Sequence, residues 1–418
     1  MVFARNRVAT LAVIVAALGY FVDIYDLILF GTVRKPSLAE LGYVTDAAQT
    51  DQGVFLFNMQ MGGLIAGGIL WGVLGDKRGR LSVLFGSIIT YSLANLANGA
   101  VTSIEQYAVC RVVAGIGLAG ELGAGITLVS ELMDKRTRGI ATAIVAGVGI
   151  LGGVAAGIIG GGIPAVYEGA YWRHAYYIGG GMGLGLLALR VGVVESGMFN
   201  KTAATSHVAR GNFFALFDRR RIGRYFSVIA VGIPVWYTVG ILITFADSVG
   251  GALGLATKPR PATALMFSYA GCAVGDVVSG LLSQWLGSRR RTLAIFIAGT
   301  AAATIAYFTV GGHSSTAFYA MCAILGFSSG YWAVFVTTAA EQFGTNLRAT
   351  VATTTPNFVR GSALLLSLGF KELIPSLGVV GAAAVVGVFA LGVAVVGLFG
   401  LRETFGVDLD FFEDQTPT

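Results

Sequence analysis

The stretch GVLGDKRGR, residues 72–80, decides how this chain folds. It lies between two long apolar runs, and it brings three basic residues and one aspartate into a short turn that its glycines permit. Of the 418 residues, 55% are hydrophobic and only 12% are charged, whereas a soluble domain carries about 25% charge. The composition therefore predicts a membrane protein that crosses the bilayer many times, with charged turns between its helices.

Apolar runs long enough to cross a bilayer recur along the whole chain. A transmembrane helix needs about 20 predominantly apolar residues. This rule predicts an all-α membrane protein with twelve transmembrane helices. They are expected at 8–31, 53–75, 81–101, 104–130, 139–163, 173–193, 224–247, 263–286, 292–312, 315–340, 349–370 and 377–400.

Basic residues indicate the orientation of these helices. If the N-terminus is inside the cell, the predicted inner ends and loops hold 20 of the 28 Lys and Arg residues, and the outer side holds six. Because basic residues accumulate on the cytoplasmic side, both termini are expected to be cytoplasmic. Topology then explains the net charge of +6, and no nucleic-acid partner is expected.

A polar segment after the sixth span divides the chain into two halves. The expected units are an N-terminal six-helix bundle (1–193), a cytoplasmic linker (194–223), a C-terminal six-helix bundle (224–400) and a cytoplasmic tail (401–418). The halves repeat one another, since ELMDKRTRG from Glu131 and EQFGTNLRA from Glu341 both place an Arg seven residues after the Glu, 210 residues apart. A six-plus-six repeat in a membrane is typical of transporters.

Several motifs resemble the major facilitator superfamily. GVLGDKRGR resembles its loop between helices 2 and 3, and RVVAGIGLA, residues 111–119, resembles its helix 4 motif. Four further elements resemble the branch of sugar porters, metabolite:H⁺ symporters and organic ion transporters: Glu131 with Arg138, Glu341 with Arg348, Glu195-Ser196, and RETFG at 402–406. The resemblance implies a transporter with two pseudo-symmetric six-helix bundles, and not an enzyme.

The charged helix ends are candidates for an intracellular gate, as the resemblance implies. Exposed ion pairs contribute only about 0–1 kcal/mol, which suits a latch that substrate binding releases. The alternative is that these charges only anchor the topology. Expected pairs join Arg80 to Glu131 or Glu195, and the arginines at 289–291 to Glu341 or Glu403. The gate residues are Asp76, Arg80, Glu131, Arg138, Glu195, Arg289, Arg291, Glu341, Arg348 and Glu403.

Ionisable residues inside the spans are candidates for proton coupling, because a charge near the bilayer centre costs about 2.5–3.5 kcal/mol or more. Asp23 and Asp26 are three residues apart and share one face of the first span. Arg111 lies at a similar depth in the fourth span and is the expected cation for Asp26. Glu121, about 15 Å deeper, is a second proton station or a helix-packing partner. The alternatives are solvated carboxylates at an external mouth and an arginine bonded to backbone carbonyls.

Arg360 and Asn357, in TTTPNFVRGSALL of the eleventh span, are candidates for substrate binding. A guanidinium offers a planar fork of donors to a carboxylate, and the resemblance to organic anion transporters implies an anionic substrate. The alternative is an internal ion pair, for example with Asp276. Aromatic side chains could line the same cavity or serve only in packing: Tyr25, Trp236, Tyr237, Tyr331 and Trp332.

Other patterns in the chain resemble known sites but do not qualify. GIGLAG (115–120) and GVGILG (147–152) fit the dinucleotide fingerprint, but they lie inside spans, where small residues allow close helix packing. The three histidines are scattered and predict no metal site. RRRIGR, residues 219–224, is expected to be an amphipathic segment at the inner membrane face.

The function expected from these features is proton-coupled uptake of a small organic anion or polar metabolite by rocker-switch alternating access. The alternatives are a proton-driven exporter, a facilitative uniporter and, more remotely, a membrane receptor that transports nothing. No cofactor is expected, with the proton as coupling ion. The partners are the substrate and the lipid bilayer, the chain is expected to be a monomer, and the location is the inner membrane of a bacterium.

Overall fold

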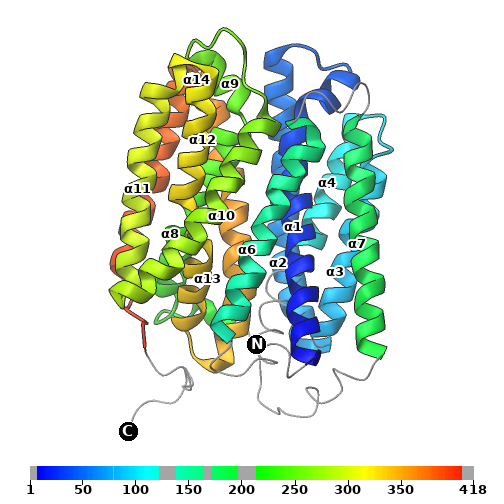
Figure 1. The fold of residues 1–418 in the computed structure, drawn as a ribbon, viewed down its shortest axis with the longest axis vertical. Coiled ribbons are helices and arrows are strands. Elements are labelled where there is room, and N and C mark those ends of the chain that lie inside the picture. Colours follow the sequence, from blue (N-terminus) through cyan, green and yellow to red (C-terminus); the bar gives the residue numbers. More distant parts are fainter. Residues whose placement is uncertain (1–6, 79, 122–137, 163–170, 196–212, 407–418) are drawn as a thin grey trace.

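The computed structural model describes residues 7–78, 80–121, 138–162, 171–195 and 213–406, and these residues form helices and short connections without a strand. The helices run along the long axis of the molecule in two groups (Figure 1). The start of α1 (Arg7–Glu40) and the end of α14 (Thr345–Gly400) lie at the same end of the bundle. We call this the terminal end, and we call the opposite end, which carries the α1–α2 connection and α9, the far end.

The first group contains α1 to α7. After α1 come α2 (Asp46–Arg78), α3 (Arg80–Asn98), α4 (Ile104–Leu118), α6 (Arg138–Gly157) with a π-helical end (Ile158–Gly162), and α7 (Tyr171–Glu195). The second group begins with a 3-10 turn (Phe213–Phe217). It continues with α8 (Ile222–Tyr237), a π-helix (Thr238–Ile243), α9 (Ala246–Ala252), α10 (Pro261–Leu286), α11 (Arg289–Val310), a 3-10 turn (Gly311–His313), α12 (Ser315–Ser329), α13 (Trp332–Glu341) and α14.

Among the described residues, seven helices are long and apolar enough to cross a membrane. One of these, α14, covers the last two predicted spans. It consists of two helical parts that meet at Gly378, where the backbone leaves helical geometry and φ is 67°. This left-handed conformation suits glycine, which has no Cβ. Mean hydropathy and length therefore support the all-α membrane fold that the sequence predicts.

The first helix is longer than predicted. The apolar run ends near residue 31, but α1 continues to Glu40 and leaves only a short connection to α2 at Asp46. The extension is possible because Arg34, which was placed in a loop, is fully buried and has a carboxylate partner, Asp247, in the other half. Pairing removes most of the penalty that would keep a guanidinium in water.

Two predicted spans of the second half are not continuous α-helices. The span at 315–340 is interrupted between α12 and α13, at Gly330 and Tyr331. The span at 224–247 changes from α8 into the π-helix at Thr238. Interruptions of this kind are tolerated inside a membrane only where neighbouring helices satisfy the freed backbone groups, and Asp276 does this at the first break, as described below.

Close glycine contacts hold the helices of each half together. On α2, a Cβ at Gly63 would collide with the backbone of α4 at Val112 and Gly115. On α10, a Cβ at Gly271 would collide with the backbone of α12 at Ala323. The second glycine follows the first by 208 residues, so the repeat seen in the charged motifs extends to the packing. Within 115–120 and 147–152, Gly115 and Gly152 likewise lie against the backbones of α2 and α1.

The two halves meet along a small set of helices. α2 packs on α14, α6 packs on α10, and α1 also touches α10. Figure 1 shows α6 and α10 side by side at the centre of the molecule. Side chains on these helices that face the other half are therefore the ones that a movement of the halves would separate.

Candidate functional site

One buried ion pair joins the two halves at their centre. Arg360 on α14 donates from Nη2 to Asp23 Oδ2 on α1, at 3.0 Å. The two residues are 1% and 0% exposed. Both were predicted as separate functional residues, Asp23 for the proton and Arg360 for the substrate. The structure instead brings them into direct contact across the interface.

The ion pair keeps unused hydrogen-bonding capacity. Asp23 Oδ1 and Arg360 Nη1 are buried without a hydrogen-bond partner. The ring of Trp332 lies 5.9 Å from the Arg360 guanidinium, and its indole Nε1 also has no partner. Asn357, one turn before Arg360, donates to the backbone oxygen of Ala119 at 2.8 Å and so also bridges the halves. A guanidinium with a free donor beside an aromatic face is suited to a small anion.

Asp276 is not the partner of Arg360, which corrects the ion pair considered above. Asp276 lies on α10, and its Oδ1 accepts the backbone N–H of Ala333 at 2.8 Å. Ala333 belongs to the first turn of α13, directly after the break at Gly330. A carboxylate at a helix N-terminus satisfies backbone donors that have no partner within the helix. Asp276 therefore stabilises the interrupted helix.

Asp26 and Arg111 are buried in the first half but do not form the expected direct ion pair. Both carboxylate oxygens of Asp26 lack a hydrogen-bond partner. Arg111 donates to Gln60 Oε1 at 3.1 Å and to Asn95 Oδ1 at 3.5 Å. Its guanidinium also lies 5.1 Å from the ring centroid of Tyr176. Two carboxamides and an aromatic ring thus hold Arg111, and neither carboxamide was predicted.

Glu121 has a buried partner that the sequence did not reveal. Arg190 on α7 forms two hydrogen bonds with the Glu121 carboxylate, of which the one to Oε2 is 3.1 Å long. Arg190 is 6% exposed, although its place near the inner end of the predicted span 173–193 puts it among the 20 inner-end basic residues. The pair lies directly against Gly19 of α1, where a Cβ would collide with Glu121 Oε1 and Arg190 Nη2.

Replacement of Gly19 by alanine is expected to separate this ion pair. The added methyl would overlap with Glu121 Oε1 and Arg190 Nη2. Because both charged groups are buried and cannot move into water, we expect a loss of stability of about 1–3 kcal/mol. Thermal unfolding of the purified protein measures the effect. The matched control is Gly181→Ala on α7, where a Cβ meets nothing within 4 Å. Equal melting temperatures for both variants would contradict the prediction.

Three of the predicted cavity aromatics are packing residues of their own half. The hydroxyls of Tyr25, Tyr237 and Tyr331 donate to the backbone oxygens of Ala175, Ala383 and Val231 at 2.8, 3.0 and 2.9 Å. Each bond ties two helices of one half together. Trp236 is buried. Of the five aromatics, Trp332 lies beside the ion pair that joins the halves.

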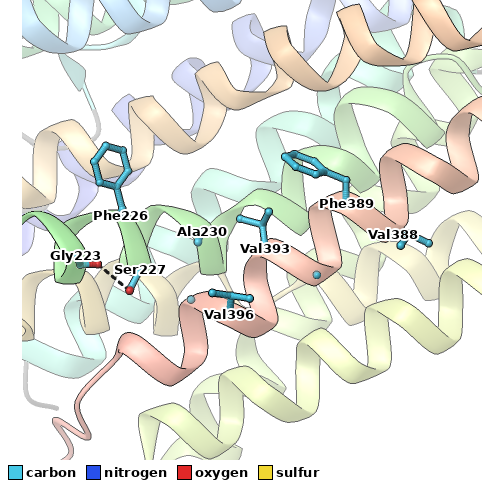
Figure 2. Close-up of a pocket in the computed structure, with 10 residues that line it drawn as sticks. Gly223, Phe226, Ser227, Ala230, Val388, Phe389, Val393 and Val396 are labelled. Carbon is cyan, nitrogen blue, oxygen red and sulfur yellow. Dashed lines mark hydrogen bonds between the residues drawn. The ribbon is translucent and has the colours of Figure 1, made fainter.

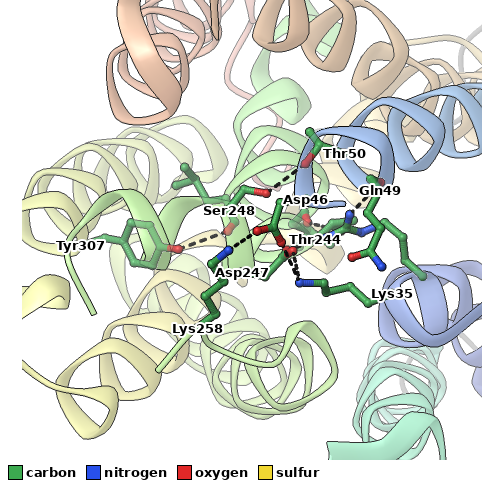
Figure 3. Close-up of polar contacts among 12 residues, drawn as sticks. Lys35, Asp46, Gln49, Thr50, Thr244, Asp247, Ser248, Lys258 and Tyr307 are labelled. Carbon is green, nitrogen blue, oxygen red and sulfur yellow. Dashed lines mark hydrogen bonds and ion pairs between the residues drawn. The ribbon is translucent and has the colours of Figure 1, made fainter. Parts of the chain in front are cut away.

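A second set of contacts between the halves closes the far end (Figure 3). Arg34 on α1 donates to Asp247 Oδ1 on α9 at 2.5 Å, and its guanidinium lies 4.7 Å from the ring centroid of Phe245. Figure 3 also shows Lys35 facing Asp247, with 3.2 Å between Nζ and Oδ2. These residues come from α1 and from the segment after α8. None of them was predicted, because Arg34 and Lys35 follow the predicted span 8–31 and Asp247 is the last residue of the predicted span 224–247, where a charge is ordinary.

Exposed ion pairs surround this buried one. Lys258 pairs with Asp46, and Lys371 on α14 pairs with Asp51 on α2. Thr50 and Ser248 share a hydrogen bond of 3.3 Å. All these contacts join the two halves at the far end. Among the described residues, the far end therefore has both a buried ion pair and exposed ones.

The predicted gate residues of the second half gather at the terminal end. Arg289 Nη2 lies 3.4 Å from Glu341 Oε1. Glu403 accepts hydrogen bonds from the Ser288 hydroxyl and from the backbone N–H of Arg289 and Arg290. Partial burial raises the pKa of Glu403, but these hydrogen bonds outweigh it and hold the pKa below its usual value. This cluster joins α13, α11 and the tail, which all belong to one half.

The remaining gate residues contribute less or lie outside the described side chains. Arg291 is exposed, and its backbone N–H donates to Ser288. Arg348 donates to the backbone oxygen of Ala340 at 3.3 Å. The side chains outside the described part are those of Asp76, Arg80, Glu131, Arg138 and Glu195. The latch between the halves therefore stays a prediction.

Comparison with known proteins supports the fold and the class of function. The sequence profile of the Major Facilitator Superfamily matches residues 11–368. A probable 4-methylmuconolactone transporter of Cupriavidus pinatubonensis is 26% identical over 401 residues, which cover 94% of this chain and 90% of that protein. A putative niacin/nicotinamide transporter of Bacillus subtilis is 26% identical over 71% of this chain and 73% of its own length.

A solved structure has the same fold. The crystal structure of a D-xylose-proton symporter superposes with a TM-score of 0.71, at 15% identity, over 96% of this chain and 99% of that one. At this identity the likeness concerns the fold alone. The profile match over most of the chain, together with these relatives, shows that this protein is a multi-pass membrane transporter of small molecules, and the chain belongs to the Major Facilitator Superfamily.

Proposed function

We propose that this transporter takes up a small organic anion together with a proton. The observation that carries the proposal is the buried Asp23–Arg360 ion pair between the halves. A proton on Asp23 removes the negative charge that Arg360 binds. The carboxylate of a substrate can then take the place of Asp23 on the guanidinium, so that the site holds the anion only when it also holds the proton.

The energetics of burial favour this exchange. An unpaired guanidinium inside the membrane is costly, so Arg360 needs an anion at each stage of the cycle. Asp23 supplies that anion in the empty transporter, and the substrate supplies it in the loaded one. Asp26 lies one helical turn further along α1 with no hydrogen bond to either oxygen. Because a buried charge without partners is costly, Asp26 is suited to carry a proton towards Asp23.

The relatives favour an anionic substrate of modest size. The Bacillus subtilis relative is named for niacin, which is an acid, and for its amide, nicotinamide. The Cupriavidus pinatubonensis relative is named for 4-methylmuconolactone, a small ring compound. The matched structure is that of a D-xylose-proton symporter, which supports a proton as the coupling ion. The two relatives described above are bacterial. The arginines at 219–221 and 289–291 lie near the terminal end, just before α8 and at the start of α11 (Figure 1). We therefore place the chain in a bacterial inner membrane, with its termini in the cytoplasm. We expect a monomer without a cofactor and without a nucleic-acid partner.

Uptake in proteoliposomes tests the proposal. Nicotinate and a panel of other small carboxylates, sugars and amines are offered with and without an inward proton gradient. We expect uptake of a carboxylate that rises as the external pH falls and that a protonophore abolishes. Uptake that ignores both the pH gradient and the protonophore would refute the coupling.

A variant pair locates the coupling. In Asp23→Asn the charge exchange is no longer possible, so accumulation driven by the pH gradient is expected to disappear while exchange of substrate across the membrane persists. Asp276→Asn is the matched control, since it neutralises another buried carboxylate but keeps the oxygen that accepts the Ala333 N–H. Loss of the pH response in both variants alike would argue against a specific role for Asp23.

A further inference from the structure

The basic segment at 219–224 has no part in the site between the halves. The preceding 3-10 turn is held against the bundle by Phe213, whose ring stacks on Phe358 of α14 at a centroid distance of 6.1 Å. Its other two aromatic side chains, Phe214 and Phe217, are 77% and 41% exposed. The exposed side chains of Arg219 and Arg220 follow directly. Exposed aromatic residues next to basic ones are typical of a segment at a membrane interface.

An apolar groove begins at the same place. It runs between α8 and the last part of α14 and encloses about 460 Å³ (Figure 2). Its floor is made of small residues, among them Ala230 and Gly392. Its walls are large apolar side chains that face away from the bundle, with Phe226 and Val396 exposed by 53% and 71%.

The groove offers a guest no free side-chain hydrogen-bond donor. Its one polar side chain, Ser227, donates its hydroxyl proton to the backbone oxygen of Gly223 at 2.8 Å, a bond drawn in Figure 2. A guest must therefore be apolar along the groove. The end of the groove at Gly223 lies close to the arginines in sequence, because Arg219 and Arg220 belong to the turn just before α8. Asp218, the acidic residue directly before the basic segment, accepts the backbone N–H of Arg220 at 3.0 Å.

We propose that this groove and the arginines beside it bind one anionic phospholipid. An acyl chain lies in the groove between α8 and α14, and the phosphate of the headgroup lies against Arg219 and Arg220. The combination favours such a lipid over a helix of a second protein, because an apolar helix has no group for the arginines. It also favours an anionic lipid over a zwitterionic one, because each basic residue near the surface attracts negative headgroups.

Native mass spectrometry of the intact transporter in detergent tests the proposal. The protein is titrated with dioleoyl phosphatidylglycerol and, separately, with dioleoyl phosphatidylcholine. We expect one phosphatidylglycerol molecule to be retained in clear preference to phosphatidylcholine. In the double variant Arg219→Gln/Arg220→Gln, the preference is expected to fall roughly fivefold for each arginine removed. Retention of both lipids to the same extent by the unmodified protein would overturn the proposal.

A second variant tests the groove itself. Gly392→Leu fills the floor, and it should fold normally because a Cβ at this position meets nothing within 4 Å. We expect it to lose the retained phosphatidylglycerol. Gly185→Leu is the matched control, an exposed helical glycine of α7 that also has nothing within 4 Å, and it should behave like the unmodified protein. Unchanged retention in Gly392→Leu, or a dimer that only this variant abolishes, would overturn the lipid assignment.

Discussion

Replacement of Arg360 by alanine is expected to abolish uptake and to lower stability at the same time. Removal of one partner leaves Asp23 as a buried carboxylate without its cation, and breaking a buried ion pair in this way costs about 3–5 kcal/mol. Transport should fall by at least about 100-fold, because the proposed anion site loses its only cation beside Trp332. Uptake assays in proteoliposomes and thermal unfolding measure the two effects.

A second variant separates transport from stability. In Asp23→Asn/Arg360→Gln both charges are absent, so much of the lost stability should return, whereas uptake should not. Arg402→Ala serves as a control, because this arginine is exposed and its hydrogen bonds with Gln342 are made by its backbone. Substantial uptake by Arg360→Ala, in membranes that contain normal amounts of protein, would show that Arg360 is structural.

Removal of the Asp247 carboxylate is expected to open the far end of the molecule. In Asp247→Ala, Arg34 keeps its place against Phe245 but loses its buried partner. The form with a closed far end should lose about 3–5 kcal/mol of stability relative to the open form. This loss is enough to shift the equilibrium between the two forms by more than 100-fold. Spin labels at Val44→Cys and Thr257→Cys, both exposed at that end, report the change as a longer distance between the halves.

The exposed ion pair at the same end provides the matched control. Lys371 and Asp51 are 40% and 47% exposed, so Asp51→Ala should cost only about 0–1 kcal/mol and should leave the distance unchanged. The double variant Arg34→Met/Asp247→Leu should close the end again, because apolar side chains can replace a buried ion pair at little cost. Similar distances in Asp247→Ala and in the unmodified protein would contradict the prediction.

The architecture was predictable from the sequence, whereas the interruptions of its helices were not. Length and hydropathy are properties of one segment, so they reveal spans and their repeat. The extension of α1 depends on Asp247, which lies 213 residues after Arg34. The break before α13 depends on the Asp276 carboxylate of α10. Contacts of this kind appear only after the helices have packed.

The residues of the candidate site could be singled out one by one from the sequence, but their partners could not. The cost of a charge in the membrane identified Asp23, Asp26, Arg111 and Arg360. Position along a helix gives a depth, however, and does not reveal which neighbouring helix a side chain faces. The sequence alone therefore allows a substrate or Asp276 as the partner of Arg360, whereas the structure brings Arg360 to Asp23. In the same way Arg190, counted as an inner-end charge, is the partner of Glu121.

The Asp23–Arg360 ion pair has an electrical consequence. In the proposed cycle, one proton neutralises one carboxylate and one monoanion replaces it, so the loaded and the empty sites carry the same charge. The movement of the halves then transfers no net charge across the membrane. The membrane potential, which is worth about 2.3 kcal/mol per charge at 100 mV, neither drives nor opposes such uptake. Accumulation of the substrate follows the pH difference alone, by about tenfold for each pH unit.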